Sequence, residues 1–134
     1  MRATRIVTCF ITNEDKILIL KRSDKVKSMK GLWAGVSGII ERDEDPLVRA
    51  KREIFEEIGL FEKQIKLLKS EKEMRIVSPQ YKNHEWSVFP FLFSTDNPTV
   101  KLNWENSDYR WISIDEIKNY ETVPSLDKVL FNLL

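Results

Sequence analysis

The chain has 134 residues, the length of one ordinary domain, so we expect a single domain over residues 1–134. Lys and Arg number 22 against 21 for Asp and Glu, which leaves a formal net charge of +1. This balance argues against a protein that coats nucleic acid or an anionic membrane. One cysteine, Cys9, excludes an intramolecular disulfide, and no apolar run reaches the roughly 20 residues of a membrane span. We therefore expect a cytoplasmic protein that binds neither a membrane nor, stably, nucleic acid.

The first third of the chain shows two strand patterns and then a turn-rich segment. Residues 5–12 and 16–21 are rich in β-branched and apolar side chains, and the turn residues between them predict a hairpin. Residues 23–30 are polar and basic, which is typical of a loop. Residues 31–38 hold three of the four glycines and predict tight turns.

Residues 46–58 carry the clearest helix signal. Asp45 suits the N-cap, Pro46 the first turn and Gly59 the C-terminal end. The rest of the chain predicts strands at 65–77, 85–94 and 109–112, a short helix at 115–120 and a terminal helix at 124–133. Strands with one central helix and a helical tail indicate an α+β domain in which helices cover a sheet.

One side of the 46–58 helix is apolar when its residues are spaced at about 100°. This predicted core face consists of Leu47, Ala50, Ile54 and Ile58, flanked by Val48 and Phe55. Lys51 also projects near this face, and we expect its chain to extend outward.

The opposite side carries Glu53, Glu56 and Glu57, which are neighbours because their spacing is i, i+3, i+4. A divalent cation such as Mg²⁺ would relieve their repulsion, because carboxylate oxygens are its preferred ligands. The alternative is a solvated polar face, since glutamate is a good helix former.

The surroundings of these glutamates favour the metal site. From Gly38, five residues lead to Glu44, and seven more lead to the run Arg-Glu-Ile-Phe-Glu-Glu-Ile-Gly-Leu over residues 52–60. This pattern resembles the Nudix box, and all seven of its fixed positions match, with apolar residues in both apolar positions. A chance match at one starting point is on the order of 10⁻⁸. The chain thus resembles the Nudix hydrolase family, through a full box from Gly38 to Leu60 and over essentially its whole length.

The resemblance implies an α+β fold, a Nudix-type α/β/α sandwich with a central mixed β-sheet. It also implies metal-dependent hydrolysis of a diphosphate linkage by water attack at phosphorus. The substrate would be a nucleoside diphosphate linked to another moiety, such as a nucleoside triphosphate or a nucleotide sugar. The competing hypothesis is a catalytically silent Nudix-like module that binds a nucleotide or a protein.

The resemblance also assigns roles to the residues of the box. Mg²⁺ or Mn²⁺ would be bound by Glu53, Glu56 and Glu57, with a backbone carbonyl of Ser37 or Gly38 assisting. Arg52 would orient Glu53 through a charge-assisted hydrogen bond, its alternative being a plain helix salt bridge. Glu44 would support the loop or the helix N-terminus.

The general base and the substrate contacts stay open at this point. The base is Glu53, Glu105 in a later loop, or Asp108, and the alternative for the last two is a solvated loop acid. Arg22, or its neighbour Lys21, is a candidate for a phosphate contact. The candidates for stacking on a base are Trp33 and Trp86, and His84 could contact substrate or lie in a surface turn. We expect a small-molecule nucleotide-type partner, and a homodimer is compatible with the sequence.

Overall fold

A computed structural model describes the backbone of residues 2–134 and the side chains from Ala3 onward. Its strands are β1 (Arg2–Asn13), β2 (Lys16–Arg22), β3 (Trp33–Ala34), β4 (Val36–Ile39), β5 (Ile65–Ser70), β6 (Met74–Ile76), β7 (His84–Thr95) and β8 (Asn106–Ile112). Its α-helices are α1 (Pro46–Ile58) and α2 (Leu126–Asn132), and its short 3-10 helices are η1 (Glu62–Gln64) and η2 (Ile114–Asn119).

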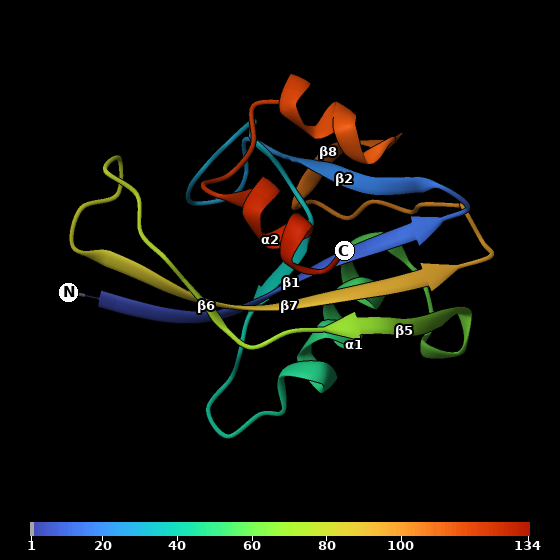
Figure 1. Ribbon diagram of the computed structural model, residues 1–134, viewed down its shortest axis with the longest axis horizontal. Helices are drawn as coiled ribbons and strands as arrows, with labels where there is room; N and C mark the ends of the chain where they lie inside the picture. The colour runs from blue at the N-terminus through green and yellow to red at the C-terminus, as the bar shows by residue number, and fades with distance from the viewer. Residues whose placement is uncertain (1) are drawn as a thin grey trace.

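The strands form one mixed sheet whose main path runs in the order β3-β2-β1-β7-β5, with β4, β6 and β8 paired off this path. The neighbours β2, β1, β7 and β5 can be followed in Figure 1. Strands β1 and β7 run parallel along their whole length, and the other pairs are antiparallel. The predicted hairpin is confirmed by the pairing of Thr12 with Ile17 at the turn. None of the helices in the described part of the chain is long and apolar enough to cross a membrane.

The sheet opens between β1 and β2, and this opening positions the site. The two strands pair only next to their turn, at Thr12 and Asn13. Further back along β1, β4 takes the place of β2 and pairs from Ile6 to Cys9. Strand β2 pairs instead with β3 and β8. The residues just before β8 and the end of β4 therefore flank the same opening.

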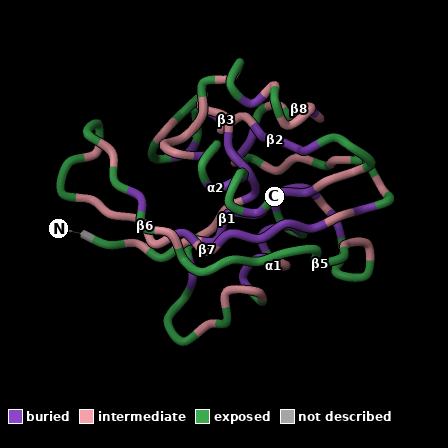
Figure 2. Tube along the Cα trace, in the orientation of Figure 1, coloured by how far each residue is buried: buried purple, intermediate pink, exposed green. Residues whose placement is uncertain are grey.

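Helices cover both faces of the sheet, which confirms the expected α/β/α sandwich. Because successive strand residues point to opposite faces, Cys9 and Ile11 of β1 face one core and Phe10 faces the other. The first core includes Ile54 and Ile58 of α1. The second core is closed by α2 and η2. Figure 2 shows that the central strands are buried, whereas β5 at the edge is exposed.

Two predicted segments differ from the observed elements. The turn-rich residues 31–38 contain the short strands β3 and β4, which the glycines obscured in the sequence. The single strand predicted at 65–77 is divided into β5 and β6, which pair with different parts of β7. The division falls opposite Pro90 of β7, and a proline has no N–H to donate to a neighbouring strand.

Helix α1 spans the predicted residues. The Asp45 carboxylate accepts the N–H of Leu47 at 2.9 Å, and Gly59 ends the helix in the left-handed conformation with a φ of 77°. Ala50 is fully buried as predicted, but Val48 and Phe55 are about half exposed, so their placement beside the core face was wrong. The residues that are buried beside Ala50, Ile54 and Ile58 are those at positions 49, 53 and 57.

Candidate active site

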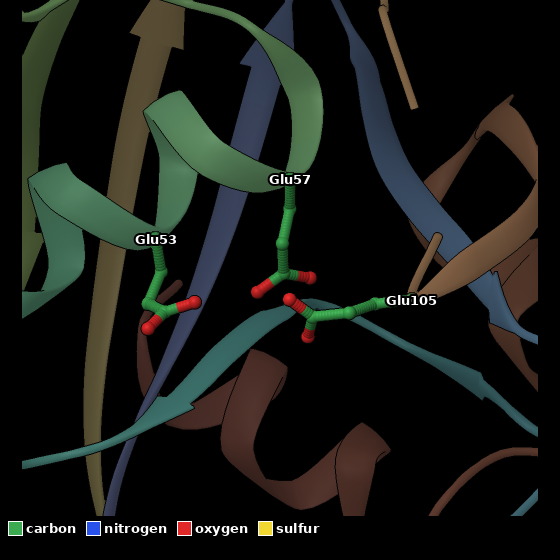
Figure 3. Close-up of side chains that lie close together, drawn as sticks. All are labelled: Glu53, Glu57 and Glu105. Atoms are coloured by element: carbon green, nitrogen blue, oxygen red, sulfur yellow. The ribbon is translucent and has the colours of Figure 1, made fainter. Parts of the chain in front are cut away.

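Three carboxylates from two distant segments meet beside the opening in the sheet. Glu53 and Glu57 project from α1, and Glu105 comes from the loop that precedes β8 (Figure 3). One oxygen of each lies within 4.8 Å of the others. Glu53 and Glu57 are only 7% and 3% exposed, whereas Glu105 is half-buried. The solvated face that was the alternative for Glu53 and Glu57 is therefore excluded.

Backbone contacts bring Glu105 to this cluster from far along the chain. The N–H of Lys101 donates to the carbonyl of Ile58 at the end of α1, at 3.0 Å. At the other end of this loop, the carbonyl of Glu105 accepts the N–H of Ser23 at 2.8 Å. The loop thus runs from the end of α1 to the end of β2. Asp108, the other candidate base, lies on β8 outside the cluster, where its carboxylate is 3.5 Å from Arg110.

Glu57 is the most buried member of the cluster. Its Oε1 accepts a hydrogen bond from Nδ2 of Asn106 at 3.1 Å, and its Oε2 has no hydrogen-bond partner among the described residues. Burial raises the pKa of Glu57 well above its ordinary value, and the charges of Glu105 and Glu53 add to this effect. A buried carboxylate with a free oxygen beside two others fits a divalent cation, because the donor set is all oxygen.

Gly38 on β4 makes room for Glu53. A Cβ atom built at this position would overlap the carboxyl group and Cγ of Glu53. Any larger residue would therefore push the Glu53 side chain away from its place. The glycine of the box has this steric function here, in addition to the ligand role of its carbonyl, which stays a prediction.

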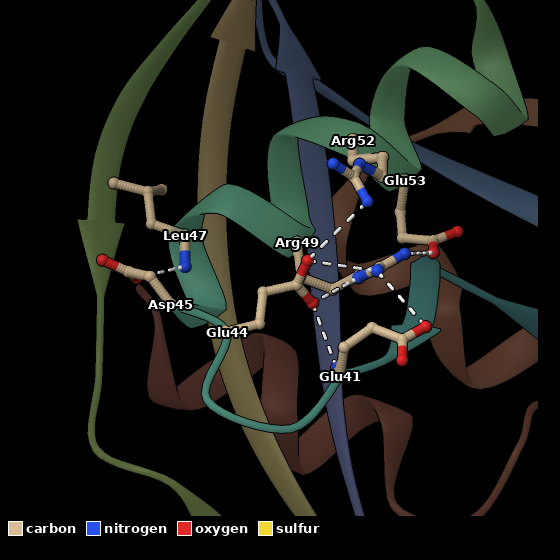
Figure 4. A network of polar contacts seen from close by, with 7 residues as sticks. All are labelled: Glu41, Glu44, Asp45, Leu47, Arg49, Arg52 and Glu53. Atoms are coloured by element: carbon tan, nitrogen blue, oxygen red, sulfur yellow. Dashed lines mark hydrogen bonds and ion pairs between the residues drawn. The ribbon is translucent and has the colours of Figure 1, made fainter.

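Arg49 binds two of the box glutamates at once (Figure 4). Its Nη1 donates to Oε2 of Glu53 at 2.9 Å, while its Nε and Nη2 donate to the two oxygens of Glu44 at 2.7 and 3.1 Å. These hydrogen bonds lower the pKa of Glu44 and raise that of Arg49. In Glu53, burial raises the pKa and the bond from Arg49 offsets part of the rise. Glu44 also accepts the N–H of Glu41, which fastens the loop before α1.

The hydrogen bond to Glu53 that was predicted for Arg52 is made by Arg49. The side chain of Arg52 is 55% exposed, and its Nη1 lies 3.9 Å from Glu44. No hydrogen bond joins Arg52 to Glu53 in the part of the chain that is described. The reason is helical geometry, because residue 49 lies one turn before Glu53 on the same stripe while residue 52 is turned toward solvent. Sequence reasoning missed two residues of the site, Arg49 and Asn106. The available signal for Arg49 was its i, i+4 spacing from Glu53, and the signal for Asn106 was its position directly after Glu105.

Glu56 does not join the cluster. Its side chain is exposed, and the group of three carboxylates consists of Glu53, Glu57 and Glu105. It lies at the rim of a cleft that also reaches Glu53 and Glu105.

The cleft has a volume of about 940 Å³ and extends from the carboxylates along the α2 face of the sheet. Arg22 lines it, and its guanidinium donates to the carbonyl of Ser28 at 3.2 and 3.0 Å. Its contact with a substrate phosphate stays a prediction. Trp33 is not among the lining residues, because it packs on the second core with its ring 5.2 Å from that of Tyr120. The other two candidates, His84 and Trp86, both line the cleft.

Comparison with known proteins agrees with this fold. The family model for the NUDIX domain matches residues 2–133, so the chain belongs to the NUDIX family. It is a pyrophosphohydrolase of that family, which acts on acid anhydrides.

The chain is 24% identical over 145 aligned residues to the dihydroneopterin triphosphate diphosphatase of Haemophilus influenzae, covering 96% of this chain and 87% of that protein. Among solved structures it resembles the MutT protein of Methanosarcina mazei, with 25% identity and a TM-score of 0.75 over 98% of this chain and 91% of that one. It also resembles the Ap4A hydrolase of C. elegans, with 18% identity and a TM-score of 0.77 over 96% and 93%. At 18% identity, the likeness to the C. elegans structure shows a shared fold and nothing more.

Proposed function

We propose that this protein hydrolyses a diphosphate linkage in a nucleoside diphosphate that carries a further group, with Mg²⁺ or Mn²⁺ as its cofactor. The observation that carries the proposal is the cluster of Glu53, Glu57 and Glu105, in which one oxygen of Glu57 has no hydrogen-bond partner among the residues that the structure describes. The cluster flanks a cleft of about 940 Å³, a size that suits a small-molecule substrate.

Glu53 and Glu57 would hold the cation, with Glu56 at the rim and the Gly38 carbonyl as further oxygen donors. When bound, the cation supplies charge neutralisation at the phosphate oxygens and lowers the pKa of water. Arg49 keeps the Glu53 carboxylate in place through its 2.9 Å hydrogen bond. Arg22, which lines the same cleft, would supply positive charge to a substrate phosphate.

Glu105 is the proposed general base. It is less buried than Glu53 and Glu57, and Asn103 holds its carboxylate through a 3.3 Å hydrogen bond from Nδ2. The water oxygen forms a bond to phosphorus while its proton passes to Glu105. The bridging P–O bond breaks, and its electron pair leaves with the departing phosphate group. Two phosphate-bearing products result.

Hydrolysis of a substrate panel tests the proposal. The panel holds nucleoside triphosphates, nucleotide sugars, diadenosine tetraphosphate and dihydroneopterin triphosphate, the last two suggested by the names of the similar proteins. The products of each substrate, which are nucleotides, sugar phosphates or pyrophosphate, are separated by anion-exchange chromatography and quantified after reaction with Mg²⁺, with Mn²⁺ and with EDTA. We expect metal-dependent turnover of at least one member.

Two variants and a control separate catalysis from simple binding. Glu57→Gln should abolish turnover, and Glu105→Gln should lower kcat by about 10²–10⁴-fold, the usual range for a lost general base. Glu71→Gln is the matched control, because Glu71 is exposed and outside the cleft. Unchanged turnover in Glu57→Gln would overturn the proposal. Nucleotide binding without turnover in either metal would instead support the silent module.

A further inference from the structure

Asn106, the first residue of β8, is a buried amide that contacts the carboxylate cluster. It is 7% exposed, and its Nδ2 donates to Oε1 of Glu57 on α1 at 3.1 Å. The other oxygen of the same carboxylate, Oε2, has no hydrogen-bond partner among the residues that the structure describes. One oxygen of Glu57 is therefore fixed by the amide, and the other is available to a ligand.

A β-bulge brings the Asn106 side chain to the face of the sheet that α1 covers. In β8, Trp111 packs on the first core and Ile112 on the second, so the odd-numbered residues face α1. An unbroken strand would turn position 106 to the opposite face. The register shifts at the end of β2, however, where Arg22 pairs with Asn106 and position 107 is left out of the pairing. This extra residue reverses the alternation, and Asn106 thereby reaches Glu57.

The backbone just before Asn106 is anchored on both sides. The N–H of Ser23 donates to the carbonyl of Glu105 at 2.8 Å, and the Ser23 hydroxyl donates to the carbonyl of Trp104 at 2.7 Å. The Asn103 side-chain oxygen accepts the N–H of Glu105 at 3.0 Å. These contacts hold the start of β8 in place, so the amide is in position before any ligand binds.

The chemistry of an amide suits a donor to a metal ligand. A lysine or arginine in this place would neutralise the carboxylate and compete with a cation, whereas an amide N–H orients the carboxylate and carries no charge. Asn106 is not among the residues that line the cleft, so its contact with the site passes through Glu57.

We propose that Asn106 is a positioning residue for metal binding, whose amide holds Oε1 of Glu57 and thereby keeps Oε2 available to a divalent cation. The proposal rests on the proposed function, because it concerns the same metal site. It predicts that loss of the amide weakens metal binding even when no substrate is present.

Binding of Mn²⁺ to the substrate-free protein, measured by calorimetry, tests this role. The variants are Asn106→Ala and, as the matched control, Ser107→Ala at the exposed neighbouring position. Loss of a group that orients a metal ligand typically weakens metal affinity about 10–100-fold, and we expect this for Asn106→Ala. Ser107→Ala should stay within about twofold of the wild type, as exposed substitutions usually do. Equal Mn²⁺ affinities for Asn106→Ala and the wild type would overturn the proposal.

A second variant keeps the test decisive if Asn106→Ala does not fold. Asn106→Ser retains a polar group, but its hydroxyl ends short of the position of the amide nitrogen. The same loss of Mn²⁺ affinity is expected for it. A wild type that binds Mn²⁺ but hydrolyses no member of the panel would count against the proposed function only, since the Mn²⁺ affinities still decide on Asn106.

The Mg²⁺ dependence of the rate separates this role from two others. Asn106→Ala should raise the Mg²⁺ concentration for half-maximal rate about 10–100-fold, and most of the lost kcat should return at saturating Mg²⁺. A purely structural role would lower the Tm in EDTA and leave the Mn²⁺ affinity of the folded protein unchanged. A contact with substrate would raise KM by the same factor at every Mg²⁺ concentration. Either of the last two results would overturn the proposal.

Discussion

Nη1 of Arg49 lies 2.9 Å from Oε2 of Glu53, one turn further along α1. The same guanidinium holds both oxygens of Glu44 and is only 8% exposed, so it links the loop before the helix to the carboxylate cluster. Such hydrogen bonds between ionised groups are about twice as strong as neutral ones and fix direction as well. Arg49 is therefore a positioning residue for Glu53, although its position is not one of the fixed positions of the box.

Arg49→Lys should impair catalysis more than Arg52→Lys. A lysine keeps the charge but lacks the planar fork, so it cannot bind Glu44 and Glu53 in the same geometry. Loss of a residue that orients a metal ligand typically costs about 10–100-fold in metal affinity or activity. We expect Arg49→Lys to lower kcat by this amount and to raise the Mg²⁺ concentration needed for half-maximal rate. Arg52→Lys should stay within about threefold of the wild type, and the opposite order would show that Arg52 orients Glu53.

Gly38→Ala should damage the site through Glu53. The added methyl group would overlap the Glu53 carboxyl group, so that side chain must leave its position. We expect the Mg²⁺-dependent rate to fall by about 100-fold, the effect of a misplacement of roughly 1 Å in an active site. Ser37→Ala on the same strand is the control, since it keeps the backbone and adds no atom. Rates for Gly38→Ala within twofold of this control would contradict the steric role.

Glu57→Gln should stabilise the metal-free protein while it abolishes activity. Because the folded-state pKa of Glu57 is raised, the folded chain binds protons more readily than the unfolded chain does. The stability of the metal-free wild type therefore gains a contribution as pH falls from above this pKa toward the ordinary glutamate value. Glutamine cannot ionise at any pH, and it keeps an oxygen for the Asn106 bond.

Thermal unfolding in EDTA measures this effect. Above the raised pKa of Glu57 we expect a Tm for Glu57→Gln a few degrees above that of the wild type. The difference should shrink as the pH is lowered through that pKa, because the wild-type carboxyl then takes up its proton. Added Mg²⁺ should raise the Tm of the wild type alone. A difference in Tm that is independent of pH would exclude the Glu57 carboxyl as its source.

The Cys9 thiol should be inert in the folded protein. It is 1% exposed, and burial raises its pKa well above the ordinary value, with the charges of Glu57 and Glu53 adding to the rise. We expect no reaction with Ellman's reagent at pH 8 over an hour and one thiol per chain in guanidinium chloride. Rapid reaction under native conditions would show that β1 opens at this point.

The residues near one another in the chain were predictable from sequence. Helix α1 and both its ends follow from Asp45, Pro46 and Gly59, since caps and helical periodicity are local properties. The hairpin of β1 and β2 follows from alternating apolar segments around a turn. The proximity of the Glu53 and Glu57 carboxylates follows from their i, i+4 spacing on α1. These inferences need only the geometry of a single helix or turn.

The tertiary structure decided which side chains meet across the fold. In sequence, Glu105 is favoured over its rival Asp108 without any proof of proximity, and the hydrogen bonds at Ile58 and Ser23 are what bring Glu105 to Glu57. Likewise, periodicity shows that α1 has an apolar side but not how far the helix is rotated on the sheet. That rotation turns Arg49 inward and Arg52 outward, because packing of Ala50, Ile54 and Ile58 is satisfied in that orientation. Such contacts depend on packing between segments distant in the chain, which no local pattern records.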